Sequence, residues 1–290
     1  MFWQIIANGA AVGSIYALIG IGFVLVYRSM GLFNFAQTEY YTLGGMVVYT
    51  LYQGLGMPYL PAMVLAVITM ALVGVITERV AFRRLLVKGA PQVNMIIASI
   101  ALGIVLRSIA LLVWNSDPLR VPPISDRSIK LGSIMLEPQL LVILGTAIAA
   151  IAVVYWLLFR TPIGMALRAT ANNRAMAQMV GIRLDLMLPV TFALSAGLGA
   201  LGGVLVSPIF FAQYNMGQAV LVKAFAAGIL GGLSSIPGAI VGGLTVGLVE
   251  NLAGWFISTA YKDVVAFVVL LAVLALRPQG ILGKSPVEKV

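Results

Sequence analysis

Long apolar runs separated by short polar segments make up most of this 290-residue chain. A helix needs roughly 20 mostly apolar residues to cross a bilayer, and several of the runs reach that length. The expected spans are residues 2–27, 33–55, 59–82, 94–114, 139–159, 188–212, 220–233, 238–258 and 264–276. The run 220–233 is short and rich in glycine, so we expect a broken or re-entrant helix there. The pattern predicts eight or nine transmembrane helices.

The composition agrees with one polytopic membrane domain over residues 1–290. The chain is 61% hydrophobic and only 9% charged, with a mean hydropathy of +1.05. A soluble domain needs far more charge on its surface. A transmembrane β-barrel would show short segments of alternating polarity instead of long apolar runs. The expected fold class is therefore an all-α polytopic membrane protein.

The net charge of +9 reports topology rather than a nucleic-acid partner, because Lys and Arg accumulate in the cytoplasmic loops of membrane proteins. Arg28 follows the first apolar run, whereas a cleavable signal peptide carries its charge before it, so this run is expected to be a retained helix. The N-terminus is then outside and the C-terminus cytoplasmic, as in a multi-pass protein of the bacterial inner membrane. Twelve basic residues fall inside, namely Arg28, Arg79, Arg83, Arg84, Lys88, Arg160, Arg168, Arg174, Arg183, Arg277, Lys284 and Lys289. Four fall outside, namely Arg120, Arg127, Lys130 and Lys262.

Several kinds of chemistry are absent from the sequence. Without Cys or His, the chain lacks thiolate nucleophiles, imidazole acid–base groups and the usual zinc ligands. The segment "PQGILGKS" (278–285) nearly matches a phosphate-binding loop, but Pro278 replaces the first glycine. Such a loop needs a strand before it and a helix after it, and neither is expected here. We therefore expect no enzyme activity and no cofactor on this chain.

A polar segment, residues 160–187, interrupts the apolar runs on the cytoplasmic side. Pro162 suits the first turn of a helix, and a second helical run is expected from about Ala171 to Val180, with Gly181 as its C-cap. Apolar residues recur there at helical spacing, which gives the short helix one apolar face. That face either lies on the membrane surface or docks into a groove of a soluble partner. The candidate contact residues are Arg168, Asn172, Asn173, Arg174, Ala175, Met176, Gln178, Met179 and Gly181.

A polar stripe is expected within the second span. As a helix, "NFAQTEYYTLGG" (34–45) places Asn34, Gln37, Thr38 and Tyr41 on one face. Buried polar side chains in a bilayer either bond neighbouring helices or line a polar path, and both alternatives stay open for this stripe. Glu39 points away from it, and we expect a structural ion pair, for instance with a basic loop residue.

Glycine is concentrated between residues 197 and 247, often at G-x-x-x-G spacing. Small residues one turn apart let helices approach closely. The run "GGLSSIPG" (231–238) also favours a helix break, which transporters place beside polar cavities. The candidate break and packing residues are Gly228, Gly231, Gly232, Pro237 and Gly238.

Other polar residues lie close to this region. The outer loop 115–138 and three side chains near the outer mouth, Gln213, Asn215 and Gln218, are candidates for contact with an external protein. Two basic residues fall within spans: Arg107 is expected to pair with Glu250, and Lys223 to extend toward the interface.

Five stretches together resemble the branched-chain amino acid ABC transporter permease family, in its shorter LivH-type subunit, over essentially the whole chain. They are "NFAQTEYYTLGG", "GMALRATANNRAMAQMVGI" (164–182), "GLGALGGVLVSP" (197–208), "GILGGLSSIPGAIVGG" (228–243) and "LRPQGILG" (276–283). The cytoplasmic segment also resembles the coupling-helix loop of ABC importers. Where that loop often opens with Glu-Ala-Ala, this chain has Ala169-Thr170-Ala171, so no coupling glutamate is assigned.

The resemblance implies an ABC importer permease architecture that acts within a larger complex. Such a subunit pairs with a homologous second permease, expected as a heterodimer, and with two cytoplasmic ATP-binding subunits that carry ATP and Mg²⁺. An extracytoplasmic substrate-binding protein delivers branched-chain or related amino acids. The segment 160–187 would transmit closure of the ATPases to the spans.

Two functions of other classes compete with this one. A self-sufficient channel or secondary transporter for a small polar solute has no need for a docking helix, and an ion-coupled carrier usually has more carboxylates within its spans. An intramembrane protease would need a Ser/Lys pair, for which Ser195 and Lys223 are the candidates.

Overall fold

The computed structural model describes residues 2–124, 129–131, 134–233, 235–277 and 279–283. Among them, six helices are long and apolar enough to cross a membrane, and two shorter apolar helices accompany them. The long ones are α1 (Phe2–Met30), α3 (Tyr59–Thr77), α5 (Gln92–Trp114), α6 (Pro138–Arg160), α9 (Leu184–Val206) and α11 (Ile236–Phe256). The shorter ones are α10 (Met216–Gly231) and the apolar part of α12 (Lys262–Leu276). The prediction of an all-helical polytopic membrane protein is confirmed.

The remaining elements are short. Helix α2 (Gln37–Tyr49) continues into the π-helical turn η1 (Thr50–Gly54), and α3 continues through η2 (Glu78–Phe82) into α4 (Arg83–Val87). The polar segment forms α7 (Pro162–Asn172) and α8 (Arg174–Met179), and the turn η3 (Thr259–Tyr261) precedes α12. Strands β1 (Ile129–Leu131) and β2 (Ile134–Leu136) form a small antiparallel hairpin in the loop after α5.

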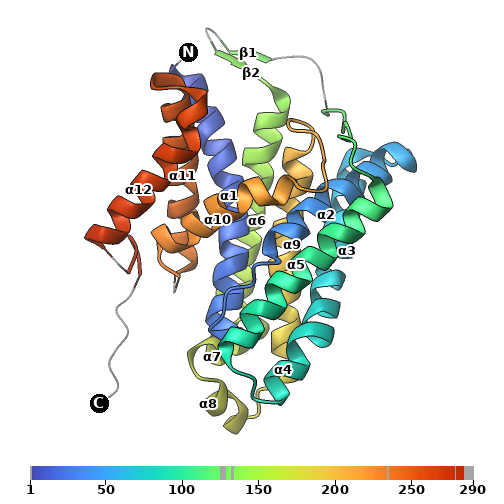
Figure 1. The fold of residues 1–290 in the computed structure, drawn as a ribbon, viewed down its shortest axis with the longest axis vertical. Helices are drawn as coiled ribbons and strands as arrows, with labels where there is room; N and C mark the ends of the chain where they lie inside the picture. The colour runs from blue at the N-terminus through green and yellow to red at the C-terminus, as the bar shows by residue number, and fades with distance from the viewer. Residues whose placement is uncertain (1, 125–128, 132–133, 234, 278, 284–290) are drawn as a thin grey trace.

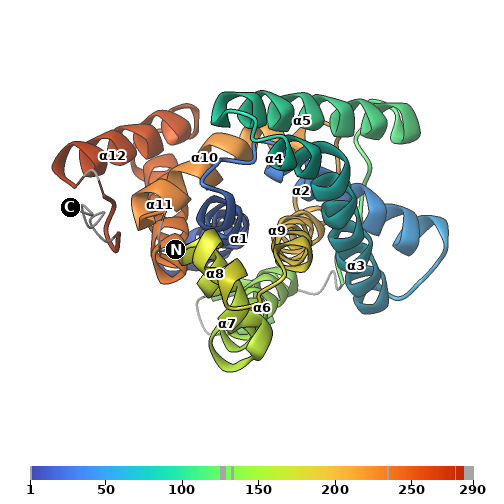
Figure 2. The same ribbon diagram turned by 90° about the horizontal axis from the view of Figure 1, so that it is seen from below.

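Helices α1 and α9 form the centre of the bundle, and the others surround them (Figure 2). In their most apolar windows, 89% of α1 and 83% of α9 is buried, against 22% of both α5 and α6. The outer helices expose large apolar side chains such as Ile104, Leu112 and Ile148. A contiguous apolar surface of this kind is solvated by lipid rather than by water.

The two ends of the molecule differ. Helices α4, α7 and α8 lie at one end, the α8 end, together with the last turn of α1, and the β1–β2 hairpin lies at the other, the hairpin end (Figure 1). The basic residues from Arg79 to Lys88 and from Arg160 to Arg183 therefore gather at the α8 end. This agrees with the clustering expected for a cytoplasmic side. Arg127, Lys284 and Lys289 lie outside the described residues.

Close contact between α1 and α11 depends on glycine. A Cβ on Gly247 would overlap the backbone of Gly13, and a Cβ on Gly13 would lie 2.8 Å from the Cα of Leu244. Gly243 meets Ala17 in the same way one turn along. Small residues at this spacing let the two backbones touch, as the G-x-x-x-G pattern predicts.

The Gly-rich run breaks the helix where the sequence predicts it. Helix α10 ends at Gly231, Gly232 has a φ of +99°, and α11 begins at Ile236. The Ser235 hydroxyl accepts a hydrogen bond from the Gly238 amide at 3.1 Å, and Pro237 lies in the first turn. Gly231 and Gly238 contact each other too closely for side chains, whereas Gly228 has room for one.

We expect Gly247→Ala to destabilise the protein. The added methyl group forces α1 and α11 apart, and overpacking of this kind costs about 1–3 kcal/mol. The measurement is thermal unfolding of the purified protein in detergent. The matched control is Gly145→Ala on exposed α6, where a Cβ meets nothing within 4 Å. Equal melting temperatures for the two variants would contradict the inferred contact.

Candidate functional site

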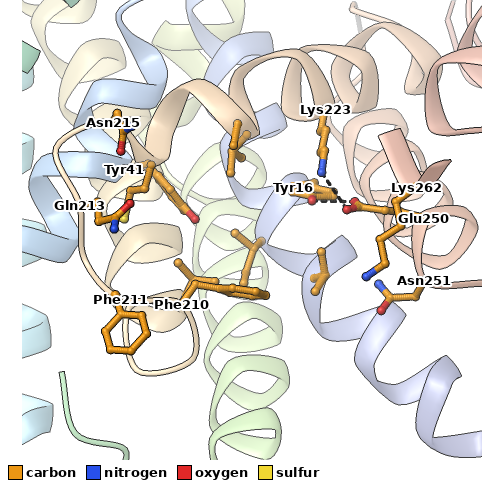
Figure 3. Close-up of a pocket in the computed structure, with 16 residues that line it drawn as sticks. Tyr16, Tyr41, Phe210, Phe211, Gln213, Asn215, Lys223, Glu250, Asn251 and Lys262 are labelled. Carbon is orange, nitrogen blue, oxygen red and sulfur yellow. Dashed lines mark hydrogen bonds and ion pairs between the residues drawn. The ribbon is translucent and has the colours of Figure 1, made fainter. Parts of the chain in front are cut away.

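A cavity of about 570 Å³ lies between α1, α10, α11 and the segment after α9 (Figure 3). Its volume is within the range of small-molecule sites, roughly 300–1,000 Å³. Phe210, Phe211 and Gln213 line it from the segment 207–215. That segment is held to the loop after α5 by two backbone hydrogen bonds of 2.9 Å between Leu119 and Ala212. The cavity therefore belongs to the half of the molecule nearer the hairpin end.

One wall of the cavity carries a buried ion pair. The Lys223 Nζ on α10 lies 2.8 Å from Oε1 of Glu250 on α11, and the Tyr16 hydroxyl on α1 donates to Oε2 at 2.7 Å. The two charged side chains are only 13% and 9% exposed. Figure 3 shows the three side chains converging from three helices. Because each charge has a partner, the pair is tolerated in an apolar surrounding.

Apart from Gln213, Asn215, Asn251 and Lys262, the rest of the cavity lining is largely apolar. Val12 and Ile15 from α1 and Val220 from α10 face the same space as Phe210. The cavity thus combines a charged end with an aliphatic and aromatic wall. Such an arrangement fits a small molecule that has both a charged group and an apolar part.

Polar residues continue from this cavity along the outer part of α1. Asn251 and Lys262 also border a second cavity of about 320 Å³, together with Gln4 and Asn8. A third cavity of about 240 Å³ shares Asn251, Val12 and Ile15 with the first. The three cavities share lining residues and together form a recess along the half of α1 nearer the hairpin end.

The expected polar stripe reaches this cavity at one position only. Tyr41 lines it, whereas Gln37 donates from Nε2 to the Ser195 carbonyl at 2.8 Å and accepts from the Ser195 hydroxyl at 2.6 Å. Thr38 is also buried, and its carbonyl accepts from the Thr42 hydroxyl. Gln37 is thus used in packing α2 against α9.

Asn34 does not lie on the helical stripe, which corrects the expected start of that helix. Helix α2 begins at Gln37, and the Asn34 side chain accepts a hydrogen bond from the Ala36 amide at 3.2 Å. An asparagine that bonds its own backbone two residues on favours a turn over a helix. The stripe is therefore shorter than the sequence pattern indicates.

The expected pairing of Arg107 with Glu250 is wrong. Arg107 on α5 bonds instead to Glu39 on α2, with 2.8 Å between Nη2 and Oε1. The reason is the packing order, because α5 lies against α2 whereas α11 lies against α1 and α10. Glu39 therefore has its structural ion pair, but with a residue of a span rather than of a loop.

The remaining ionisable and nucleophilic candidates are also placed. Ser195 bonds Gln37 and the Gly22 carbonyl, and Lys223 bonds Glu250, so no Ser/Lys pair is formed between them. No group of three potential metal ligands occurs among the described residues. In the segment 278–285, Pro278, Lys284 and Ser285 lie outside the described residues. Ile281 and Leu282 of that segment donate backbone hydrogen bonds to the last turn of α10.

Three polar side chains, Gln213, Asn215 and Gln218, are expected at an external contact. Gln213 and Asn215 line the cavity, whereas Gln218 is exposed on α10 and does not. Tyr16 was not singled out by the sequence, since a tyrosine inside an apolar run has no distinguishing pattern. The expectation that Lys223 extends toward the interface is wrong, because its ammonium bonds Glu250 within the bundle.

The α8 end carries a second candidate site. Met176, Met179 and Val180 are 58%, 80% and 75% exposed, and Ala175 is exposed beside them. Helix α8 is shorter than the expected 171–180, because Asn173 leaves the helical conformation. Its side chain then accepts a hydrogen bond from the Met176 amide at 3.1 Å and caps α8. The apolar face is uncovered in this chain.

Helix α8 is nevertheless fastened to the bundle. Arg174 donates from Nε to the Ser29 carbonyl at 2.7 Å, and partial burial lowers the pKa of this guanidinium. Arg168 stacks over the Phe159 ring at 4.9 Å, and a Cβ on Gly164 of α7 would overlap backbone oxygens of α6. Asn172 and Gln178 are exposed, and Gly181 has a φ of +85° as expected for a C-cap.

Comparison with known proteins gives a consistent answer over the whole chain. Residues 5–274 match the family model described as "Branched-chain amino acid transport system / permease component". The chain is 34% identical to the high-affinity branched-chain amino acid transport system permease protein LivH of Escherichia coli strain K12, covering 100% of this chain and 98% of that protein. It is 30% identical to a probable LivH of Methanocaldococcus jannaschii, covering 97% and 92%.

A solved structure shows a related fold. PsaBC from Streptococcus pneumoniae in complex with Fab superposes with a TM-score of 0.50 at 16% identity, covering 96% of this chain and 92% of that chain. At this identity the likeness concerns the fold alone.

We expect Arg107→Met to destabilise the protein, because it leaves the Glu39 carboxylate, whose side chain is 3% exposed, without its partner. Breaking a buried ion pair on one side costs about 3–5 kcal/mol, whereas neutral replacement of both partners is often tolerated. The double variant R107M/E39Q should therefore recover most of the loss in thermal unfolding. A single variant that melts like the wild type would show that the pair has no structural role.

Proposed function

The chain belongs to the family of branched-chain amino acid transport permease components, and on this premise we propose that it imports branched-chain amino acids as one subunit of an ABC transporter. It is a multi-pass membrane permease. The substrate is proposed from the full-length relatives, whose names specify branched-chain amino acid transport. A cavity with a charged end and an apolar wall is suited to such a substrate. A self-sufficient channel or secondary transporter is not favoured by this family membership.

The partners are a homologous second permease, two ATP-binding subunits and an extracytoplasmic substrate-binding protein. What supports an ATPase partner is the uncovered apolar face of α8, formed by Ala175, Met176, Met179 and Val180. An amphipathic helix with an exposed apolar face docks into a complementary groove. The ATP and Mg²⁺ would be held by those subunits.

The single observation that best supports coupling is the bond between α8 and α1. Arg174 is joined to the carbonyl of Ser29 at one end of α1, and Tyr16 of the same helix borders the cavity. The two positions are about 20 Å apart along the helix, at 1.5 Å per residue. A displacement of α8 by the ATPases would therefore move a wall of the cavity. This is a rigid-body route to alternating access.

The orientation follows from the distribution of charge. We place the α8 end, where the basic segments gather, in the cytoplasm, and the cavity toward the extracytoplasmic side. The N-terminus would then be extracytoplasmic. The recess around α1 would receive the amino acid from the binding protein.

The proposed function is tested by reconstitution. The permease, its homologous partner, the two ATPases and the binding protein are expected to accumulate leucine in proteoliposomes only with ATP. This chain alone is expected to give no uptake. Leucine movement through liposomes that contain only this chain would overturn the proposal, as would a complete complex that hydrolyses ATP but accumulates no branched-chain amino acid.

For α8 we expect A175D/M179D to reduce ATP-driven uptake at least about tenfold, because two carboxylates on the apolar face prevent docking. Loss of roughly 1.4 kcal/mol of binding energy is enough for a tenfold effect. The matched control is Q92E/N94D, which adds the same charge at exposed polar positions outside the segment 160–187. Co-purification of the ATPase subunits and uptake are measured on variants with equal membrane insertion. Equal results for the two double variants would exclude α8 as the docking face.

A further inference from the structure

We propose that Lys223 and Glu250 recognise the zwitterionic head of the transported amino acid, an inference that rests on the proposed function. In the structure the two side chains bond each other at 2.8 Å. When substrate enters, the ammonium of Lys223 binds its carboxylate and the carboxylate of Glu250 binds its ammonium.

The geometry supports the assignment because the pair is part of the cavity wall. Lys223, Glu250 and Tyr16 all border the 570 Å³ cavity, and they come from α10, α11 and α1. The Tyr16 hydroxyl bonds Oε2 of Glu250 at 2.7 Å, while Lys223 bonds Oε1. Tyr16 therefore fixes the carboxylate, and the Lys223 contact can be exchanged without freeing both oxygens.

The opposite charges of Lys223 and Glu250 favour a zwitterion over a singly charged ligand. A zwitterion replaces one ion pair by two, so every charge keeps a partner and the net charge of the site does not change. A simple carboxylate would displace Glu250 from Lys223, and a simple amine would displace Lys223 from Glu250, so each forms one ion pair by breaking another. Breaking a buried ion pair is costly, and only the zwitterion gains two pairs for the one that it breaks.

The same exchange makes substrate binding weak, because the substrate must compete with the ion pair between Lys223 and Glu250. Weak binding suits a permease that receives its substrate from a binding protein and must release it on the other side. The apolar side chain of the amino acid would lie against Val12, Ile15 and Val220. The charged head and the aliphatic chain thus each have a matching wall.

A second ion pair among the described residues provides a matched control. Glu39 and Arg107 also join two helices, with the same separation of 2.8 Å, but neither residue borders this cavity. Neutralising either pair removes one positive and one negative charge from the interior. If ion pairs serve only packing, the two neutral double variants should behave alike.

The test compares K223M/E250Q with R107M/E39Q in the complete reconstituted complex. Both are expected to assemble and to hydrolyse ATP, but leucine uptake should fall at least about tenfold in K223M/E250Q only, a loss of about 1.4 kcal/mol. Equal uptake by the two variants, with wild-type uptake intact, would overturn this inference and leave the proposed function standing. A wild-type complex that takes up no leucine would overturn the proposed function itself.

A gentler variant and a ligand series cover the case in which K223M/E250Q does not fold. Tyr16→Phe removes only the hydroxyl that holds Glu250 and is expected to raise the KM for leucine uptake with little change in thermal stability. In the wild-type complex without binding protein, leucine should raise the melting temperature more than 4-methylpentanoate or 3-methylbutylamine, each of which lacks one charge. Equal shifts for the three compounds, or an unchanged KM in Y16F, would contradict zwitterion recognition.

Discussion

The absence of water from the bilayer core is the constraint on which this structure depends. A polar group that cannot reach water must find its partner inside the protein. Both buried ion pairs, Lys223–Glu250 and Arg107–Glu39, obey this requirement, and each joins two helices. Gln37 meets it by bonding both the carbonyl and the hydroxyl of Ser195. The interior polar residues therefore determine which helices lie side by side.

Close packing around α1 connects the two ends of the molecule. Its contact with α11 requires glycine at positions 13 and 247, because a side chain there would separate the backbones. The same helix carries Tyr16 beside the cavity and Ser29 beneath α8. Close packing of this kind transmits displacement along a helix, which is the route by which the proposed ATPase partner would act on the cavity.

Sequence patterns predicted much of the fold and less of the site. The apolar runs located the long helices to within a few residues, and "GGLSSIPG" located the break between α10 and α11. The exposed face of α8 was also recognisable from its spacing. Asn34 and Asn173 lie at helix boundaries rather than inside the expected helices, because each side chain bonds nearby backbone where hydrophobicity alone would continue the helix.

The sequence by itself determined that the chain spans a membrane, roughly where its long helices lie, and on which face α8 is apolar. These properties depend on residues that are close together in the chain, because bilayer thickness and helical periodicity act locally. Only the tertiary structure decided that Glu250 bonds Lys223 and Tyr16 rather than Arg107. Such a choice depends on which helices are neighbours and on how they are rotated. Lys223 and Tyr16 are 27 and 234 residues away from Glu250 in the chain, so they meet it only after the bundle has packed.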